Sequence, residues 1–168
     1  MSVSRSAMEV FTYDLKVASN SSPEFIDITD EVAEFLKGSG ISNGILVVFS
    51  RHTTSAIVIQ ENEPLLLEDF KEMLERVSSK DARYRHNDFD VRTVHMHENE
   101  CPNGHSHCQH LTLGSSEMIP VVEGKMALGE WQRIFMVELD GMKGEMVGSR
   151  EVIVQIMGLA NGVGMGLA

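Results

Sequence analysis

The chain has 168 residues, about the length of one domain, and its 42% hydrophobic and 23% charged residues argue against wholesale disorder. Fourteen Lys and Arg against 25 Asp and Glu give a formal net charge of −11, which argues against general nucleic-acid binding and against docking on anionic membrane surfaces. The longest apolar run, Ile45 to Phe49, is too short for a transmembrane helix.

The first sixty residues predict three strands and one short helix. Residues 9–17 alternate apolar and polar side chains, which is typical of a half-buried strand. A short helix is predicted over residues 31–37, because Thr29 or Asp30 can cap it. Residues 44–50 and 55–60 are continuous apolar runs, which predicts buried strands rather than edge strands.

A second helix and a long polar segment follow. Pro64 suits the first turn of a helix, and the apolar residues after it recur at helical spacing, namely Leu66, Phe70, Met73 and Val77. From Ser79 to Cys108 this apolar period disappears. A polar loop of that length inside one domain is usually functional or disordered.

The last third of the chain predicts further strands. Strand-like segments lie near Leu111 and over residues 118–122, 131–139 and 151–157. Strands outnumber helices and no βαβ rhythm is sustained, so the predicted class is α+β with mainly antiparallel sheets in a single domain, residues 9–158.

The two ends of the chain and its cysteines complete this outline. We expect residues 1–8 to be a flexible N-terminus and residues 159–168 a flexible Gly-rich tail. The first residues carry no apolar segment of the secretory type, and two cysteines are too few for a disulfide scaffold. The expected compartment is therefore the cytoplasm.

Histidines are concentrated in the polar segment. Six of the seven lie between His86 and His110. Neutral imidazole is a common zinc ligand, and three imidazoles with an open position form a catalytic metal site. On a strand, His105 and His107 share a face and could reach one ion. The alternative is a solvated His-rich tract that binds metal only adventitiously.

A closed structural zinc site is a competing interpretation. It would use Cys101, His105, His107 and Cys108. The spacing of the two cysteines is not one of the usual zinc pairs, and adjacent His107 and Cys108 would point apart on a strand.

His52 stands apart from the other histidines, directly after the apolar run that ends at Ser50. Polar clusters at strand ends are common places for sites. Glu61 and Glu63 lie at the far end of the next predicted strand, before the second helix. Glu63 is expected to complement the dipole of that helix, and Glu61 is equally compatible with this role and with a functional one.

These residues also carry a resemblance. His52-Thr53-Thr54-Ser55-Ala56, followed by Ile59-Gln60-Glu61-Asn62-Glu63, resembles the HTTAA…INEN signature of the YjbQ family, described as secondary thiamine-phosphate synthases. The match continues through Tyr84-Arg85-His86-Asn87, Asn103-Gly104-His105-Ser106-His107 and Ile119-Pro120-Val121-Val122-Glu123-Gly124-Lys125. It ends with Leu128-Gly129-Glu130-Trp131-Gln132, Glu138-Leu139-Asp140-Gly141 and the segment 152–158, so it covers about residues 9–158.

The resemblance implies a fold, an assembly and a metal site. The fold would be β-sandwich-type antiparallel sheets with two main helices, assembled as a homotrimer. The metal ligands would be His52, His86 and His107, with His105 as an additional or neighbouring ligand. The ion would be divalent, with zinc first and magnesium or manganese as alternatives.

The resemblance also suggests roles around that metal. Glu61 and Asn87 are the candidate catalytic residues, although an Asn also suits a loop turn. The candidate substrate-binding residues are Arg51, Thr53, Thr54, Arg85, Trp131 and Gln132, and a lone Trp in a strand is also typical of a core. The ligand would be a small phosphorylated molecule.

Three functions remain open from the sequence. The first is an enzyme that joins a pyrimidine diphosphate to a thiazole phosphate with loss of pyrophosphate. The second is a metal-dependent hydrolase that uses bound hydroxide. The third is a non-enzymatic, metal-stabilised trimeric binding module.

Overall fold

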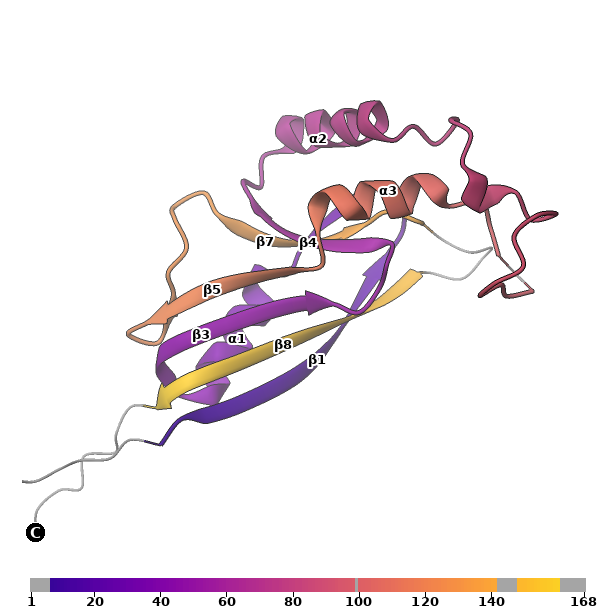
Figure 1. Cartoon of the computed structure of the whole chain (residues 1–168). Coiled ribbons are helices and arrows are strands. Elements are labelled where there is room, and N and C mark those ends of the chain that lie inside the picture. The colour runs from indigo at the N-terminus through magenta and orange to yellow at the C-terminus, as the bar shows by residue number, and fades with distance from the viewer. Residues whose placement is uncertain (1–6, 99, 142–147, 161–168) are drawn as a thin grey trace, which may run out of the picture.

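The computed structural model describes residues 7–98, 100–141 and 148–160 (Figure 1). Its elements in chain order are β1 (Glu9–Ser19), β2 (Glu24–Asp27), α1 (Thr29–Ser39), β3 (Ile41–Ser50), β4 (Ser55–Gln60), α2 (Pro64–Val77), the 3-10 helix η1 (Arg85–Asn87), α3 (Gly104–Leu113), β5 (Ser116–Val122), β6 (Lys125–Met126), β7 (Arg133–Glu138) and β8 (Gly148–Ala160). No helix among these residues is both long and apolar enough to cross a membrane.

Two antiparallel sheets form the body of the fold. One has the strand order β1-β8-β3-β5-β6 and is strongly curled, and the other has the order β2-β7-β4 (Figure 1). The main core lies between them, with Leu46 and Val154 from the first sheet, Ile57 and Met136 from the second and Val32 from α1. The predicted α+β class with antiparallel sheets in sandwich-like packing is confirmed.

The two continuous apolar runs occupy different positions in these sheets. β3 is a central strand between β8 and β5, as predicted. β4 is an edge strand, so that part of the prediction was wrong; its first residues are nevertheless buried because α3 packs against it. Apolar side chains also remain exposed on the outer face of β3 and its neighbours, among them Ile45, Phe49 and Met118.

Helix α2 begins as its sequence predicts. Pro64 occupies the first turn, and the Glu63 side chain accepts hydrogen bonds from the backbone N–H groups of Leu65 and Leu66 at 3.1 and 2.7 Å. The expectation that Glu63 serves the helix N-terminus is confirmed.

Helix α3 was not predicted. The sequence predicts a loop up to Cys108 and a strand near Leu111, and both predictions were wrong, so the described residues form three α-helices rather than two. The inner face of α3 is polar, since its buried residues include His105, Ser106 and Gln109. The segment therefore lacks the helical spacing of hydrophobic residues by which a helix is predicted from sequence.

Contacts from distant segments hold α3 in place. Gln109, 2% exposed, donates hydrogen bonds to the carbonyl oxygens of Leu74 and Ser78 at the end of α2. The Asn87 side-chain oxygen accepts hydrogen bonds from the N–H groups of Asn103 and Gly104 at 3.1 and 3.0 Å. These contacts give hydrogen-bond partners to the polar groups that α3 buries, which an isolated helix would leave to water.

The segment between α2 and α3 contains a partly buried ion pair. Arg92 and Glu100, with side chains only 16% exposed, pair in two-point geometry at 2.6 and 2.9 Å. At the other end of the chain, β8 continues to Ala160, two residues into the segment predicted as a tail. The rest of that tail and residues 1–6 lie outside the described residues.

Candidate functional site

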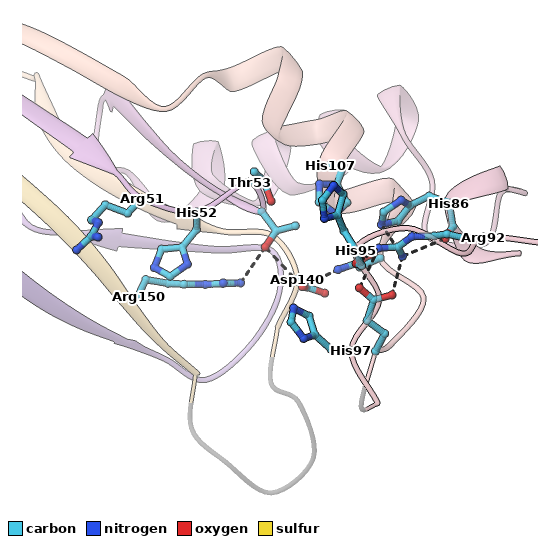
Figure 2. A pocket seen from close by; sticks show the side chains of 13 residues that line it. Arg51, His52, Thr53, His86, Arg92, His95, His97, His107, Asp140 and Arg150 are labelled. Carbon is cyan, nitrogen blue, oxygen red and sulfur yellow. Dashed lines mark hydrogen bonds and ion pairs between the residues drawn. The ribbon is translucent and has the colours of Figure 1, made fainter. Parts of the chain in front are cut away.

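A cleft of about 470 Å³ opens where β3 ends, β8 begins and the segment before α3 crosses (Figure 2). Its lining combines five histidines, three arginines, two carboxylates and three smaller polar residues. They are Arg51, His52, Thr53, Thr54, His86, Arg92, His95, His97, Glu100, Asn103, His107, Asp140 and Arg150. The cleft therefore gathers predicted site residues from three separate motifs.

His86 and His107 form a pair in this cleft. They come from η1 and α3, and their ring centroids are 4.6 Å apart. Burial lowers the pKa of His107, and the charge of a protonated His86 lowers it further, so the neutral imidazole of His107 is favoured. The His86 Nε2 atom lies 3.3 Å from Arg92 Nη1, and because a guanidinium can only donate, this nitrogen is the acceptor.

His105 points away from this pair. Residues two apart on an α-helix lie on different sides of it, so the prediction that His105 and His107 share a face was wrong. His105 is 8% exposed, its Nε2 atom lies 3.2 Å from Ser106 Oγ, and it lines a separate cavity of about 110 Å³ beside Glu75 and Lys80. The His105 side chain does not line the cleft.

His52 lies at the opposite end of the cleft from His86 (Figure 2). Its Nε2 atom accepts a hydrogen bond of 2.9 Å from the backbone N–H of Glu151. Burial lowers the pKa of His52, and the neighbouring charge of Arg150 lowers it further. This ring is therefore held neutral, with one nitrogen already in use.

The donor set only partly fits the expected metal. Across residues 7–98, 100–141 and 148–160, no three His, Cys, Asp or Glu side chains are arranged to hold one ion. His86 and His107 are imidazoles that face the same space, and His86 would ligate an ion at Nε2 only after the Arg92 side chain turns away from that atom. His52 does not complete the set, because its Nε2 atom is engaged with the backbone.

The closed structural zinc site is not formed either. Cys101 and Cys108 are exposed and unpaired, and His105 and His107 face different cavities.

Arg150 was missed by the sequence analysis, and a buried carboxylate fixes its position. Glu138 is fully buried and accepts hydrogen bonds from Arg150 Nε at 2.6 Å and Nη2 at 2.5 Å. Burial would raise the pKa of Glu138, but hydrogen bonds from Arg150 and from the N–H groups of Asp140 and Gly141, together with the Arg150 charge, hold it below its usual value. A signal was present in the sequence, since Glu138 is the one charged residue inside an otherwise apolar run, 134–139.

Asp140 supplies a carboxylate to the middle of the cleft (Figure 2). Its Oδ2 atom accepts a hydrogen bond of 2.9 Å from Asn103 Nδ2 and lies 3.5 Å from Thr54 Oγ1. Asp140 therefore links the first turn of α3 to the loop after β3.

Several predicted site residues lie elsewhere. Glu61, Trp131 and Gln132 stand at the far end of β4 and β7, because β4 runs away from His52 and pairs its last residue, Gln60, with the first residue of β7. Trp131 is 65% exposed, so it is not a core residue. The Gln132 side chain accepts a hydrogen bond from the N–H of Gly129.

The remaining predicted residues divide in the same way. Arg51, Thr53 and Thr54 line the cleft, whereas Arg85 is exposed and does not. The oxygen of Asn87 is bonded to two N–H groups at the start of α3. The catalytic roles of Glu61 and Asn87 and the substrate contacts of Arg85, Trp131 and Gln132 stay predictions.

Comparison with known proteins gives consistent matches. Residues 13–159 match the family model described as UPF0047 protein YjbQ-like. A UPF0047 protein of Methanothermobacter thermautotrophicus is 46% identical over 140 residues, which cover 83% of this chain and 90% of that protein. UPF0047 protein YugU of Bacillus subtilis is 30% identical over 145 residues, covering 86% and 97%.

Solved structures of similar fold match the chain as well. A YbjQ-like protein of unknown function from Sulfolobus solfataricus P2 superposes with a TM-score of 0.79 at 36% identity, covering 90% of this chain and 99% of the other. A hypothetical protein from Aeropyrum pernix K1 gives a TM-score of 0.76 at 34% identity, covering 88% and 98%. The match extends over nearly the whole described fold, including the elements that build the cleft.

Proposed function

We propose, for a chain that belongs to the UPF0047 YjbQ-like family, an enzymatic function based on its His-rich cleft. The relatives compared above are named without an activity, so the proposal rests on the chemistry of the cleft and on the family resemblance. The enzyme binds a small phosphorylated molecule in the cleft. A divalent metal, zinc before magnesium or manganese, is held there by His86 and His107.

The observation that carries this proposal is the contrast between the cleft and the rest of the chain. The protein has a formal net charge of −11, yet three arginines and five histidines line one cleft. Its two carboxylates, Glu100 and Asp140, already accept hydrogen bonds from Arg92 and Asn103. Guanidinium and imidazole N–H groups match the oxygen atoms of a phosphate.

The proposed reaction is a group transfer of the thiamine-phosphate synthase type, in which a diphosphate leaves and a thiazole nitrogen takes its place. A divalent ion at His86 and His107 supplies Lewis-acid stabilisation of negative charge when it is bound. Arg51 and Arg150 stabilise charge that develops on phosphate oxygens. A hydrolase would use the same residues with water in place of the thiazole, and Asp140 would accept the proton that the water loses.

A trimeric assembly is part of the proposal. The outer face of the five-stranded sheet exposes apolar side chains from four strands, including Val10, Ile45, Phe49, Met118 and Leu159. Exposed apolar surface of this kind is typical of a protein interface. It supports the homotrimer, as enzyme or as binding module, and analytical ultracentrifugation of the untagged chain tests it. The proposed compartment is the cytoplasm, where the exposed thiols of Cys101 and Cys108 stay reduced.

Elemental analysis and a product assay test the function together. The untagged chain should retain about one divalent ion per chain, and His86→Ala or His107→Ala should lose it. His110→Ala is the matched control, since His110 lies on the same helix and does not line the cleft. Metal-loaded protein that forms no thiamine phosphate from the two substrates contradicts the transferase activity. Loss of thermal stability in His107→Ala, together with no product from the metal-loaded parent, favours the binding module.

A further inference from the structure

We propose that His52 and Arg150 form an oxyanion-binding subsite at one end of the cleft, in which His52 donates a hydrogen bond to a phosphate and does not ligate a metal. This inference rests on the proposed function, because it states how the phosphorylated molecule is held in the same cleft. Figure 2 shows His52 and Arg150 next to each other, with His86 and Arg92 at the other end.

The hydrogen bond from Glu151 determines which nitrogen of His52 carries the proton. A backbone N–H can only donate, so the Nε2 atom of His52 accepts at 2.9 Å and carries no hydrogen. In a neutral imidazole the proton is then on Nδ1. The ring therefore offers an N–H donor to a ligand in the cleft.

The same argument removes His52 from the metal ligands. A metal at Nε2 would have to replace the hydrogen bond from Glu151, at the place where β3 and β8 are paired. This donor is a backbone N–H and cannot turn aside, whereas the donor to His86 Nε2 is the Arg92 side chain, which can. A metal at Nδ1, with Nε2 still accepting, would leave an imidazole with no proton at all. Such an imidazolate is too basic to form here at neutral pH.

Arg150 is held so that one edge of its guanidinium is unused. Its Nε and Nη2 atoms both bind Glu138, and Nη2 also donates to Thr54 Oγ1 at 3.2 Å. Within the described part of the chain, its Nη1 atom makes no hydrogen bond. This leaves a donor with fixed direction in a residue that lines the cleft, which is the arrangement that recognises a phosphate oxygen.

Glu138 is the residue that positions Arg150. Besides the two bonds from Arg150, its carboxylate accepts hydrogen bonds from Ser19 Oγ at 3.1 Å and from the N–H groups of Asp140 and Gly141 at 2.9 and 3.1 Å. A carboxylate held from three segments of the chain cannot rotate. The guanidinium that pairs with it is therefore preorganised before the ligand arrives.

The first experiment reads the His52 ring directly. The full chain is labelled with ¹⁵N-histidine, and long-range ¹H–¹⁵N correlation spectra are recorded before and after addition of zinc chloride. The His52 signals are assigned by their loss in His52→Gln. We expect a protonated Nδ1 and an unprotonated Nε2 in His52, and zinc should shift the signals of His86 and His107 but not those of His52. The opposite tautomer, or a zinc-shifted His52, overturns the inference.

The second experiment measures binding of inorganic phosphate by calorimetry with metal-free protein. His52→Ala should weaken binding at least tenfold. His52→Asn should keep most of the affinity, because its amide nitrogen stands near the position of Nδ1, whereas His52→Gln should not. Arg83→Ala, an exposed arginine outside the cleft, is the matched control and should bind like the parent. Equal affinities for the parent and His52→Ala overturn the inference.

Arg150 and Glu138 are tested in the same assay. Arg150→Lys keeps the positive charge but loses the two-point pairing with Glu138. Glu138→Gln weakens the same pairing and so frees the guanidinium to move. Each variant should therefore weaken phosphate binding about tenfold. If either variant does not fold, the His52 series still decides the question, because it leaves the buried pair intact. Sodium acetate as competitor separates the ligand classes, and displacement of phosphate by equimolar acetate points to a carboxylate and overturns the phosphate assignment.

The two proposals fail separately. Absence of zinc binding or of product contradicts the proposed function, whereas phosphate binding and the His52 tautomer are read without metal or turnover. A parent chain that binds no phosphate contradicts the subsite whatever the metal does.

Discussion

The two walls of the cleft are built in different ways. The sheet wall, His52, Thr54 and Arg150, stands at the ends of neighbouring strands and is tied to the fully buried Glu138. The loop wall, His86, Arg92 and His107, stands on η1, on α3 and on the segment between them, and it is held mainly by side-chain contacts such as Arg92 to Glu100. A sheet ladder fixes its residues through many cooperative bonds, so the sheet wall suits recognition of a fixed group and the loop wall suits adjustment around a ligand.

Removing the arginine of the sheet wall should have the largest effect. Arg150→Ala leaves the Glu138 carboxylate fully buried without its partner, and breaking such a pair costs about 3–5 kcal/mol. Urea denaturation followed by circular dichroism measures the free energy of unfolding. A loss below about 1 kcal/mol contradicts the view that the pair holds this wall together.

A methyl group at the start of α3 should disturb the loop wall. The Cβ of Ala at position 104 would lie 2.4 Å from Tyr84 Cβ, so Gly104→Ala should cost about 1–3 kcal/mol and move His107. The matched control is Gly38→Ala in α1, where no atom lies within 4 Å and the helix should gain up to about 1 kcal/mol. Thermal melts of both variants measure the difference, and equal melting temperatures contradict it.

The loop-wall arginine should matter less for stability than Arg150. Arg92→Ala removes a two-point pair whose side chains keep 16% exposure, so water can reach the carboxylate left behind. We expect a loss of about 1–2 kcal/mol in the same urea assay, together with tighter zinc binding, because the guanidinium no longer occupies the Nε2 atom of His86 or repels a cation there. A loss as large as that of Arg150→Ala would show that the two walls are equally rigid.

Acid should weaken the fold in two stages. Burial lowers the pKa of His52, His105, His107 and His110, so below about pH 6.5 the unfolded chain binds more protons than the folded one and the free energy of unfolding falls. Glu138, whose pKa is also lowered, adds a second loss as the pH falls below about 4.5. Urea denaturation at a series of pH values measures both stages. Glu138→Gln should remove the Glu138 contribution to the second stage, and stability that rises between pH 6.5 and 5 contradicts the first.

The elements that could be predicted are those whose own residues bury an apolar face. The alternation in 9–17 lies within β1, and the helical spacing after Pro64 gives α2, with Glu63 as its cap. The polar inner face of α3 could not be read in this way, because Gln109 and His105 are buried by contacts with distant segments. His-rich composition therefore indicated the region of the site but not which histidines share it.

The sequence by itself determined the antiparallel α+β class, the position of most strands and the concentration of imidazoles in one segment, since periodicity and composition are local properties. Only the tertiary structure decided which side chains meet. His52 and Arg150 are neighbours because β3 pairs with β8 across more than a hundred residues of chain, and His107 faces the cleft while His105 turns away because their segment is a helix. Such neighbours are set by strand pairing and helix geometry, and neither is visible in the spacing of residues along the chain.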